Sequence, residues 1–430
     1  MPDPAHTTPF FVRLNAAARI FQALMDNIAR WGCVAILFAA PTSRALFNLS
    51  AAAIVLGWVL SGRYGSRLRT MVSNPIGLPA LLMAALIVVG SSYTVAPWAD
   101  VWDHWERYSK FLLVPLMVSL LDDERWRQRA WQAFVVAMLI ILASTYVNVW
   151  LDIPWSKTHN QGFGVDHSVF ANHIAQGLVM SFFVAVAVVR FKQSARADQR
   201  LLWAIVAILA IFSVTHLSLG RAGQLALPVV LAVLALVAVP SRWRLTAVAI
   251  VAVAVVLLVW SSSVLQKRFD LVLEQINAYD FKNDYTSVGA RLHMWKTSLD
   301  LIFESPLVGH GTGAYHSLAA KAFNDPVMCD IACFHPHNQL LFFGVDHGLI
   351  GIVLFLFYLY RPIRYAWGST DAEAVLLLSF MAVFAVDIMV HGALWIHMEA
   401  YFFFSMLALL MSSAAVKKQV ARPRAGRGLL

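Results

Sequence analysis

Two histidines, an asparagine and a glutamine stand together in Phe334-His-Pro-His-Asn-Gln339, just before a long hydrophobic stretch. A neutral imidazole accepts protons, and its ordinary pKa of about 6.5 suits a general base at neutral pH. We predict that His337 removes a proton from an incoming hydroxyl group, with His335 placed to share or replace that role. Asn338 and Gln339 are candidate substrate contacts. The alternative is that His337 and Asn338 only cap the following helix.

Two arginines have the neighbours of a phosphate-binding site. Arg221 lies in a short turn between hydrophobic stretches, Ser218-Leu-Gly-Arg-Ala-Gly223, whose glycines allow close backbone approach. Arg291 starts an amphipathic segment that Ser287 could cap, and a helix N-terminus beside an arginine favours anions. Because guanidinium is permanently charged and holds phosphate oxygens in pairs, we predict a phosphate or pyrophosphate clamp. The alternative is a snorkelling or solvated arginine.

Further polar residues stand at the ends of hydrophobic stretches, where ionisable groups are candidates for function. We assign them to substrate binding, with interhelical hydrogen bonds or snorkelling as the alternative, and Asp387 could also orient the histidine base. They are Arg107, Lys110, Asn172 beside His173, and Asp387 near His391.

The elements that must position these residues are membrane-spanning helices. Of 430 residues, 60% are hydrophobic and 13% are charged, whereas soluble domains have about 45–50% and about 25%. This leaves too little polar surface for a soluble globule, and it excludes disordered and disulfide-scaffold classes. Long apolar runs, rather than alternating ten-residue strands, predict an all-α polytopic membrane protein. The net charge of +9 is scattered over many loops, which argues against nucleic acid as a partner.

Hydrophobic windows predict about twelve transmembrane helices. They lie near residues 28–45, 47–61, 75–93, 105–121, 130–151, 169–189, 201–218, 224–239, 245–263, 338–360, 372–392 and 394–413. The division we expect is helices one to nine in 1–263, a loop domain in 264–337, helices ten to twelve in 338–413 and a basic cytoplasmic tail in 414–430.

The distribution of Lys and Arg predicts the orientation. With both termini in the cytoplasm, every inner segment contains Lys or Arg, as the positive-inside rule requires. The start of the chain has no short apolar core with a cleavage site, so we expect insertion through the chain's own helices. The candidate site then lies on the outer face, which in a bacterial inner membrane has no ATP. A reaction there needs an activated substrate, such as a lipid-linked pyrophosphate.

The long outer loop 264–337 should fold, because its apolar residues have helical spacing. One helix should end before Pro306, and Val264–Ile276 is a shorter amphipathic candidate. The face of the first helix comprises Leu292, Trp295, Leu299, Ile302 and Phe303. Near the end of the loop, Cys329 and Cys333 suggest either a short disulfide or, with the two histidines, a zinc site; the outer face favours the disulfide.

Taken in order, four motifs resemble the O-antigen ligase and polymerase superfamily, and the last looks most like the ligase branch. The motifs occupy mainly residues 215–351. They are Ser218-Leu-Gly-Arg221, Arg291-x-x-Met-Trp295, Ser305-Pro-Leu-Val-Gly309-His-Gly311 and His337-Asn338-x9-Gly348-x-x-Gly351.

The resemblance implies a multi-pass inner-membrane glycosyltransferase with a periplasmic active site. It implies transfer of a polysaccharide from undecaprenyl pyrophosphate to a lipid A–core sugar hydroxyl, with inversion and without a metal or other cofactor. Its functional residues map onto Arg221, Arg291 and His337, and apolar walls between helices would hold the polyprenyl chain among membrane lipids.

Four alternatives remain open. An O-antigen polymerase uses the same donor but a growing glycan as acceptor, and a protein O-oligosaccharyltransferase uses a protein. A lipid or polysaccharide transporter belongs to another class, and Asp346-His347 within a predicted span is the feature that favours it. A metal-dependent transferase would lose activity with a chelator.

Overall fold

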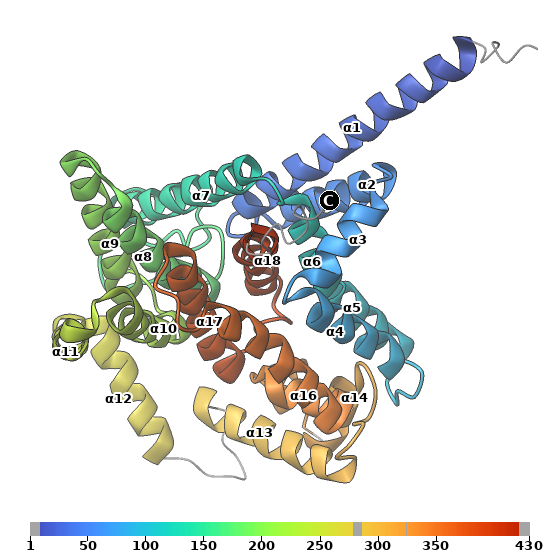
Figure 1. The fold of residues 1–430 in the computed structure, drawn as a ribbon. Coiled ribbons are helices and arrows are strands. Elements are labelled where there is room, and N and C mark those ends of the chain that lie inside the picture. The colour runs from blue at the N-terminus through green and yellow to red at the C-terminus, as the bar shows by residue number, and fades with distance from the viewer. Residues whose placement is uncertain (1–8, 278–285, 324, 421–430) are drawn as a thin grey trace, which may run out of the picture.

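The computed structural model describes residues 9–277, 286–323 and 325–420. Within these ranges every regular element is a helix, so the predicted all-α class is confirmed (Figure 1). Most of the predicted basic tail, residues 421–430, lies outside the described ranges.

The N-terminal half supplies the helices on one side of the bundle. They are α1 (Pro9–Ala39), α2 (Arg44–Leu60), α3 (Tyr64–Ser73), α4 (Gly77–Gly90), α5 (Trp98–Tyr108), α6 (Lys110–Leu120), α7 (Glu124–Trp150), α8 (His173–Gln193) and α9 (Ala197–His216).

The second half supplies the remaining helices, including those of the long loop. They are α10 (Arg221–Val233), η1 (Leu234–Ala238), η2 (Ser241–Trp243), α11 (Arg244–Ser261), α12 (Ser263–Asn277), α13 (Ser287–Glu304), α14 (Ala314–Phe323), α15 (Pro326–Ala332), α16 (Gln339–Ala366), α17 (Ala372–Val390) and α18 (His397–Val420).

Eight of the described helices are long and apolar enough to cross a membrane, and a ninth span results if the bent pair α3 and α4 counts as one. Helix α11, for example, has no buried residues and exposes many apolar side chains, as a lipid-facing helix does. The protein is therefore a multi-pass membrane protein by length and composition.

The predicted count of twelve spans is not confirmed, although each predicted window falls on helical segments. The window 75–93 contains α4, which is bent by 95° against α3. The window 105–121 is divided between α5 and α6 near Ser109, and α6 has only 11 residues, too few to cross a bilayer that needs about 20. Apolar composition correctly identified both windows as helical, but each window contains or adjoins a break, so its helices are shorter than a full span.

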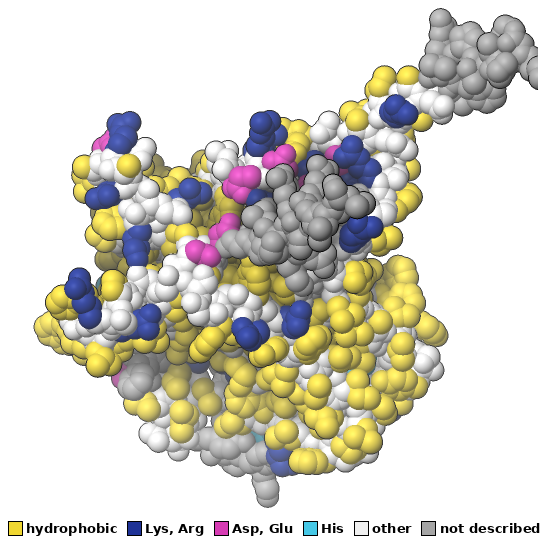
Figure 2. All heavy atoms as spheres, viewed as in Figure 1, with side chains coloured by type: hydrophobic (Ala, Val, Ile, Leu, Met, Phe, Trp, Pro, Cys, Tyr) yellow, Lys and Arg dark blue, Asp and Glu magenta, His cyan; other side chains and the backbone are white. Residues whose placement is uncertain are grey.

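Helix α18 forms the centre of the bundle and is surrounded by the other helices in Figure 1. Its residues from Ala400 to Ala414 are all buried, and it packs against α6 and α17. Hydrophobic side chains surround it on all sides, as in a fully buried helix. Figure 2 shows Lys and Arg mainly on the upper and left parts of the visible face, while its lower right is hydrophobic.

Helix α16 is broken where the third and fourth motifs meet. Gly348 has φ 59° and ψ −151° inside the helix, a conformation that favours glycine. A Cβ on Gly309 would lie 2.5 Å from the His347 nitrogen, and a Cβ on Gly348 would lie 2.5 Å from the Leu307 carbonyl carbon. The two glycines therefore let the loop after α13 pack directly on the α16 backbone.

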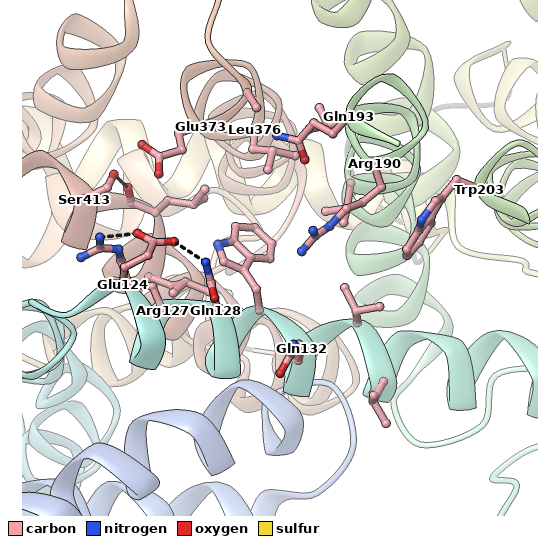
Figure 3. A pocket seen from close by; sticks show the side chains of 18 residues that line it. Glu124, Arg127, Gln128, Gln132, Arg190, Gln193, Trp203, Glu373, Leu376 and Ser413 are labelled. Carbon is pink, nitrogen blue, oxygen red and sulfur yellow. Dashed lines mark hydrogen bonds and ion pairs between the residues drawn. The ribbon is translucent and has the colours of Figure 1, made fainter. Parts of the chain in front are cut away.

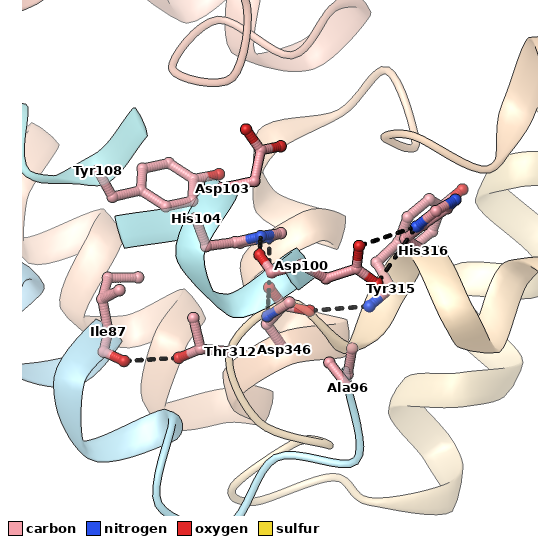
Figure 4. A network of polar contacts seen from close by, with 12 residues as sticks. Ile87, Ala96, Asp100, Asp103, His104, Tyr108, Thr312, Tyr315, His316 and Asp346 are labelled. Atoms are coloured by element: carbon pink, nitrogen blue, oxygen red, sulfur yellow. Dashed lines mark hydrogen bonds and ion pairs between the residues drawn. The ribbon is translucent and has the colours of Figure 1, made fainter. Parts of the chain in front are cut away.

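Asp346 anchors that loop from the same break (Figure 4). Its carboxylate accepts hydrogen bonds from the backbone nitrogens of Gly313 (3.2 Å) and Tyr315 (3.1 Å). His104 of α5 places Nε2 3.2 Å from the same carboxylate. The charge within this predicted span thus holds α5, the loop and α16 together, which gives Asp346 a structural function that a transport pathway does not require.

Candidate functional site

Three imidazole rings from two distant segments lie in contact at one end of the bundle. The ring centroids of His335 and His337 are 4.2 Å apart, and that of His391 is 5.0 Å from His337 and 5.7 Å from His335. His335 and His391 are buried, and His337 is half-buried. We call these three residues the histidine cluster. More than fifty residues separate His391 from the segment of His335 and His337, so α16 and α17 must pack together to form the cluster.

The backbone of this segment is held in an unusual conformation. His337 has φ 49°, in the left-handed region, and its backbone nitrogen donates to Nδ1 of His335 at 3.3 Å. Asn338 caps α16, because its side-chain oxygen accepts hydrogen bonds from the backbone nitrogens of Leu340 and Leu341. The left-handed residue and the cap fix where the His337 side chain leaves the chain.

Two buried carboxylates, those of Asp387 and Glu399, lie next to His391 of the histidine cluster. Nδ1 of His391 lies 2.7 Å from Oε2 of Glu399 on α18 and 3.9 Å from Oδ1 of Asp387 on α17. Asp387 and Glu399 are almost fully buried. The short contact holds the His391 ring against Glu399 and so fixes the ring's orientation in the cluster.

Helix α13 brings Arg291 to the same region. Thr286, rather than the predicted Ser287, caps this helix, with its side chain accepting from Gly289 N at 3.1 Å. The Ser287 hydroxyl instead accepts a hydrogen bond from Nη1 of Arg291 at 3.2 Å. Nε1 of Trp295, one turn further along, donates to the carbonyl oxygen of Pro336 at 3.1 Å. The helix and the histidine segment are thereby joined directly.

The electrostatics link Arg291 to both sides of the site. Burial lowers the pKa of Arg291, and the charge of Arg221 lowers this pKa further. Burial also lowers the pKa of His337, with further contributions from His335, His391 and Arg291. Burial lowers the pKa of His335 to about 3, so both imidazoles are neutral at physiological pH. The site thus combines unprotonated imidazoles with guanidinium charge, an arrangement that favours an anion.

Arg221 is the first residue of α10, in a turn packed against the start of α8. A Cβ on Gly220 would lie 2.3 Å from the carbonyl oxygen of His173, and one on Gly223 would lie 2.6 Å from the backbone of Gly177. The predicted close approach at these glycines is confirmed. Asp166, which the sequence did not single out, accepts a hydrogen bond from Leu219 N at 3.3 Å and steadies the turn.

An apolar cavity of about 460 Å³ extends from Arg221 between α10, α11 and α12. We call it the α10–α12 cavity. Apart from Arg221, Gln224 and Thr215, its walls are apolar: Leu225, Leu227, Pro228, Leu231, Val255, Leu258, Val259, Leu265 and Val272. A charged group stands at one end of a hydrocarbon-lined space, which suits an amphiphile with an anionic head.

Arg107 borders the histidine cluster. It donates from Nη1 to the carbonyl oxygen of Trp395 at 2.8 Å and stacks its guanidinium 4.1 Å from that ring centroid. Its charge also contributes to lowering the pKa of His335. Lys110 is nearly buried and donates to the carbonyl oxygens of Glu106 and Arg107.

Other predicted contacts are engaged by the fold. Gln339 is fully buried, and its amide pairs with Tyr108 Oη at 2.9 Å and Leu394 N at 3.1 Å. Asn172 caps α8 by accepting from Ala175 N at 2.8 Å. Together with the capping Asn338, these side chains position the site's segments. The predicted capping alternative is therefore confirmed for Asn338.

Cys329 and Cys333 form a disulfide, with their Cα atoms 4.7 Å apart. It favours the first of the two sequence alternatives, because thiolate ligands for zinc are then absent from this pair. The bridge ends α15, whose Met328 packs with Met294 of α13. It therefore braces the segment that leads into the histidine cluster.

The described residues contain two groupings with the ligand types of a metal site. The ligand atoms of the histidine cluster lie within 4.8 Å of one another, as do those of Asp387, His391 and Glu399. Neutral imidazoles are good ligands for Zn²⁺. The sequence had no spacing signal for either grouping. The signal for Glu399 was a carboxylate inside a predicted hydrophobic span.

Comparisons with known proteins locate the family signal in the second half of the chain. Residues 205–356 match the family model described as O-antigen ligase, close to the four motifs. An uncharacterised protein of Haemophilus influenzae is 30% identical over 171 residues, which cover 38% of this chain and 43% of that protein.

An O-antigen ligase of Escherichia coli is 26% identical over 184 residues, covering 40% of this chain and 42% of its own length. The matched part thus spans about two fifths of the length of these two curated relatives. The family model and the Escherichia coli relative support an activity of the ligase or polymerase type in a membrane protein. With the family model on residues 205–356, the predicted resemblance to the O-antigen ligase superfamily is confirmed for this part of the chain.

Proposed function

We propose that the protein transfers a polysaccharide from a polyprenyl pyrophosphate, undecaprenyl pyrophosphate in bacteria, to a sugar hydroxyl of lipid A–core. The observation that carries the proposal is the hydrogen bond from Trp295 to Pro336, which joins the helix of Arg291 to the segment of His337, together with the effect of the Arg291 charge on the pKa of His337. The Nδ1 atom of His337 has no hydrogen-bond partner among the described residues. A proton acceptor and an anion-binding group therefore lie on directly connected segments.

The donor lipid suits the α10–α12 cavity. Its diphosphate would lie at Arg221 and Arg291, and its polyprenyl chain along the leucines and valines of the cavity wall. Burying apolar chain contributes about 25 cal/mol per Å², and a guanidinium pair neutralises charge on the diphosphate. Arg107, which is paired with Asp103 at 3.0 Å, and Lys110 remain proposed substrate contacts near the histidine cluster.

The reaction proceeds by displacement at the anomeric carbon of the donor glycan. The acceptor oxygen forms a bond to that carbon while His337 takes its proton. The bond from the anomeric carbon to the diphosphate oxygen breaks, and its electron pair leaves with the diphosphate. Attack opposite to the leaving group inverts the configuration. Arg221 and Arg291 stabilise the charge that develops on the leaving group, which is often the largest catalytic contribution.

The depressed pKa of His337 is compatible with this role. In the unliganded protein burial disfavours imidazolium, with further contributions from His335, His391 and Arg291. A bound diphosphate offsets the arginine charges and raises the affinity of His337 for the proton. The base is thereby strengthened when the donor is in place. His391, held by Glu399, packs against His337 and restricts its ring.

The localisation we propose is a bacterial inner membrane, with both termini cytoplasmic and the histidine cluster periplasmic. The residues 264–337 would form the periplasmic loop domain. The test is transfer by purified protein supplied with lipid-linked glycan and lipid A–core. His337→Ala should abolish transfer without changing membrane expression, and near-normal transfer would remove its role as base. His159→Ala, which alters an exposed histidine paired with Asp152, is the matched control.

Arg221→Lys tests the clamp separately, because lysine keeps the charge but loses the paired hydrogen bonds. Transfer should fall strongly, and full activity would contradict the clamp. In cells lacking the protein, unattached lipid-linked chains in a ladder indicate a ligase, whereas core carrying single repeats indicates a polymerase.

A further inference from the structure

A second cavity, of about 640 Å³, is shown in Figure 3. It lies at the opposite end of the bundle from the histidine cluster. We call it the α7–α8 cavity. It is lined by the start of α7, the end of α8, the start of α17 and the last turns of α18. The histidine cluster instead adjoins the end of α17 and the start of α18, so the two sites are separated by the length of these helices.

One cation in this cavity has no counter-ion. The guanidinium of Arg190 has no hydrogen-bond or ion-pair partner among the described residues, and Figure 3 shows it extending from α8 toward α7. The amide side chains of Gln128, Gln132 and Gln193 line the same space. An anionic group with several oxygen atoms would satisfy both the charge and the amide donors.

The other charged groups of the cavity are engaged. Arg127 is 7% exposed. Its Nη1 donates to the carbonyl oxygens of Leu121 and Asp122, and its Nη2 pairs with Glu124. Glu124 also accepts from Gln128 at 3.2 Å, and Glu373 has an interaction of its own. The Nε of Arg127 is buried without a partner, so this wall retains a second unused donor.

The deeper walls are apolar. They consist of Val135, Val136, Val186, Val189, Leu376, Leu409 and Leu410. Val135 lies about 16 Å along α7 from Glu124 at about 1.5 Å per residue. Trp131 and Trp203 also line the cavity, and tryptophans are enriched at membrane interfaces. The cavity therefore has a polar mouth and a hydrocarbon interior.

We propose that the α7–α8 cavity binds an anionic phospholipid, with its phosphate on Arg190 and its acyl chains against the valines and leucines. A soluble phosphate compound would leave the apolar walls unfilled, whereas a phospholipid fills both parts. Basic pockets between helices bind such headgroups at the cytoplasmic side of membranes. This site is separate from the proposed transfer reaction and does not depend on it.

The test is native mass spectrometry of the purified full-length protein titrated with dioleoylphosphatidylglycerol. The wild type should retain one lipid tightly, and Arg190→Gln should weaken that binding about tenfold by removing a charge-assisted contact. Arg190→Lys should keep much of the affinity. The matched control is Arg364→Gln, an exposed arginine near the end of α16, at the same end of the bundle and outside the cavity lining.

Two competition measurements complete the design. Glycerol 3-phosphate should not displace the lipid, and phosphatidylethanolamine should bind more weakly than phosphatidylglycerol. Equal lipid binding by the wild type and Arg190→Gln would overturn the proposal. So would displacement by glycerol 3-phosphate or equal retention of the zwitterionic lipid. Monodisperse elution and an unchanged helical circular dichroism spectrum of each variant establish that it is folded.

Discussion

The indole of Trp295 donates a hydrogen bond to the carbonyl oxygen of Pro336, 3.1 Å away and 41 residues later in the chain. Trp295 lies one turn after Arg291 on α13, and Pro336 stands between His335 and His337. A single contact therefore joins the helix that carries the proposed anion-binding arginine to the segment that carries the proposed base. The distance between the two functional groups depends on it.

Trp295→Phe should lower transfer activity about three- to tenfold, because it removes the donor while keeping an aromatic ring in place. A lost hydrogen bond costs about 1 kcal/mol, and small displacements of a base slow proton transfer. The measurement is the rate of glycan transfer at saturating donor. Trp367→Phe, at a tryptophan that is 71% exposed, is the matched control. Unchanged rates in both variants would show that this contact does not position the site.

Stability should decrease on acidification through the buried His335. Its pKa is lowered to about 3 in the folded protein, against about 6.5 in the unfolded chain. The unfolded chain then binds more protons between these values, so this contribution is fully present above pH 6.5 and is lost as the pH falls toward 3. Thermal unfolding in detergent should show a Tm that declines below pH 6.5.

The His335→Gln variant isolates this contribution, since glutamine does not titrate. Its Tm should fall less steeply than that of the wild type over the same pH range. Parallel curves for the two proteins would mean that other groups govern the acid limb.

Added Zn²⁺ should inhibit transfer, because the histidine cluster offers three ligand atoms within 4.8 Å of one another and zinc competes for neutral imidazoles. A chelator should restore the rate after zinc and should leave untreated enzyme unaffected. The assay is glycan transfer with zinc, with chelator and with both. A chelator that abolishes activity, with recovery on adding metal, would instead support a metal-dependent transferase.

Reduction of the Cys329–Cys333 bridge should destabilise the segment before the histidine cluster. Loop-closure entropy for so short a loop corresponds to about 2 kcal/mol. Replacing both cysteines by serine should lower the Tm and reduce transfer. In the oxidised protein only the buried Cys33 is unpaired, so alkylation under denaturing conditions should modify one cysteine before reduction and three after it. Three modified residues before reduction would contradict the bridge.

Much of this architecture was readable from local features of the chain. Apolar composition predicted helices across a membrane, and the spacing from Leu292 to Phe303 predicted α13 before Pro306. Helix formation depends on neighbours three and four residues apart, so a helix can be recognised from the spacing of apolar residues in the sequence. The motifs around Arg221, Arg291 and His337 also predicted the family resemblance from the sequence. They lie within residues 205–356, the region that the family model matches.

Helix packing decided the rest. His391 and Glu399 reach the proposed base only because α17 and α18 return to the start of α16, and no local pattern encodes that return. Packing also assigned Gln339 and Asn338 to hydrogen bonds within the fold, although their types equally suit ligand contacts. The count of twelve spans is not confirmed, because hydropathy measures composition, whereas the breaks at Ser109 and between α3 and α4 depend on the surrounding helices. The sequence determines which functional groups are present, whereas helix packing determines which of them come together in one site.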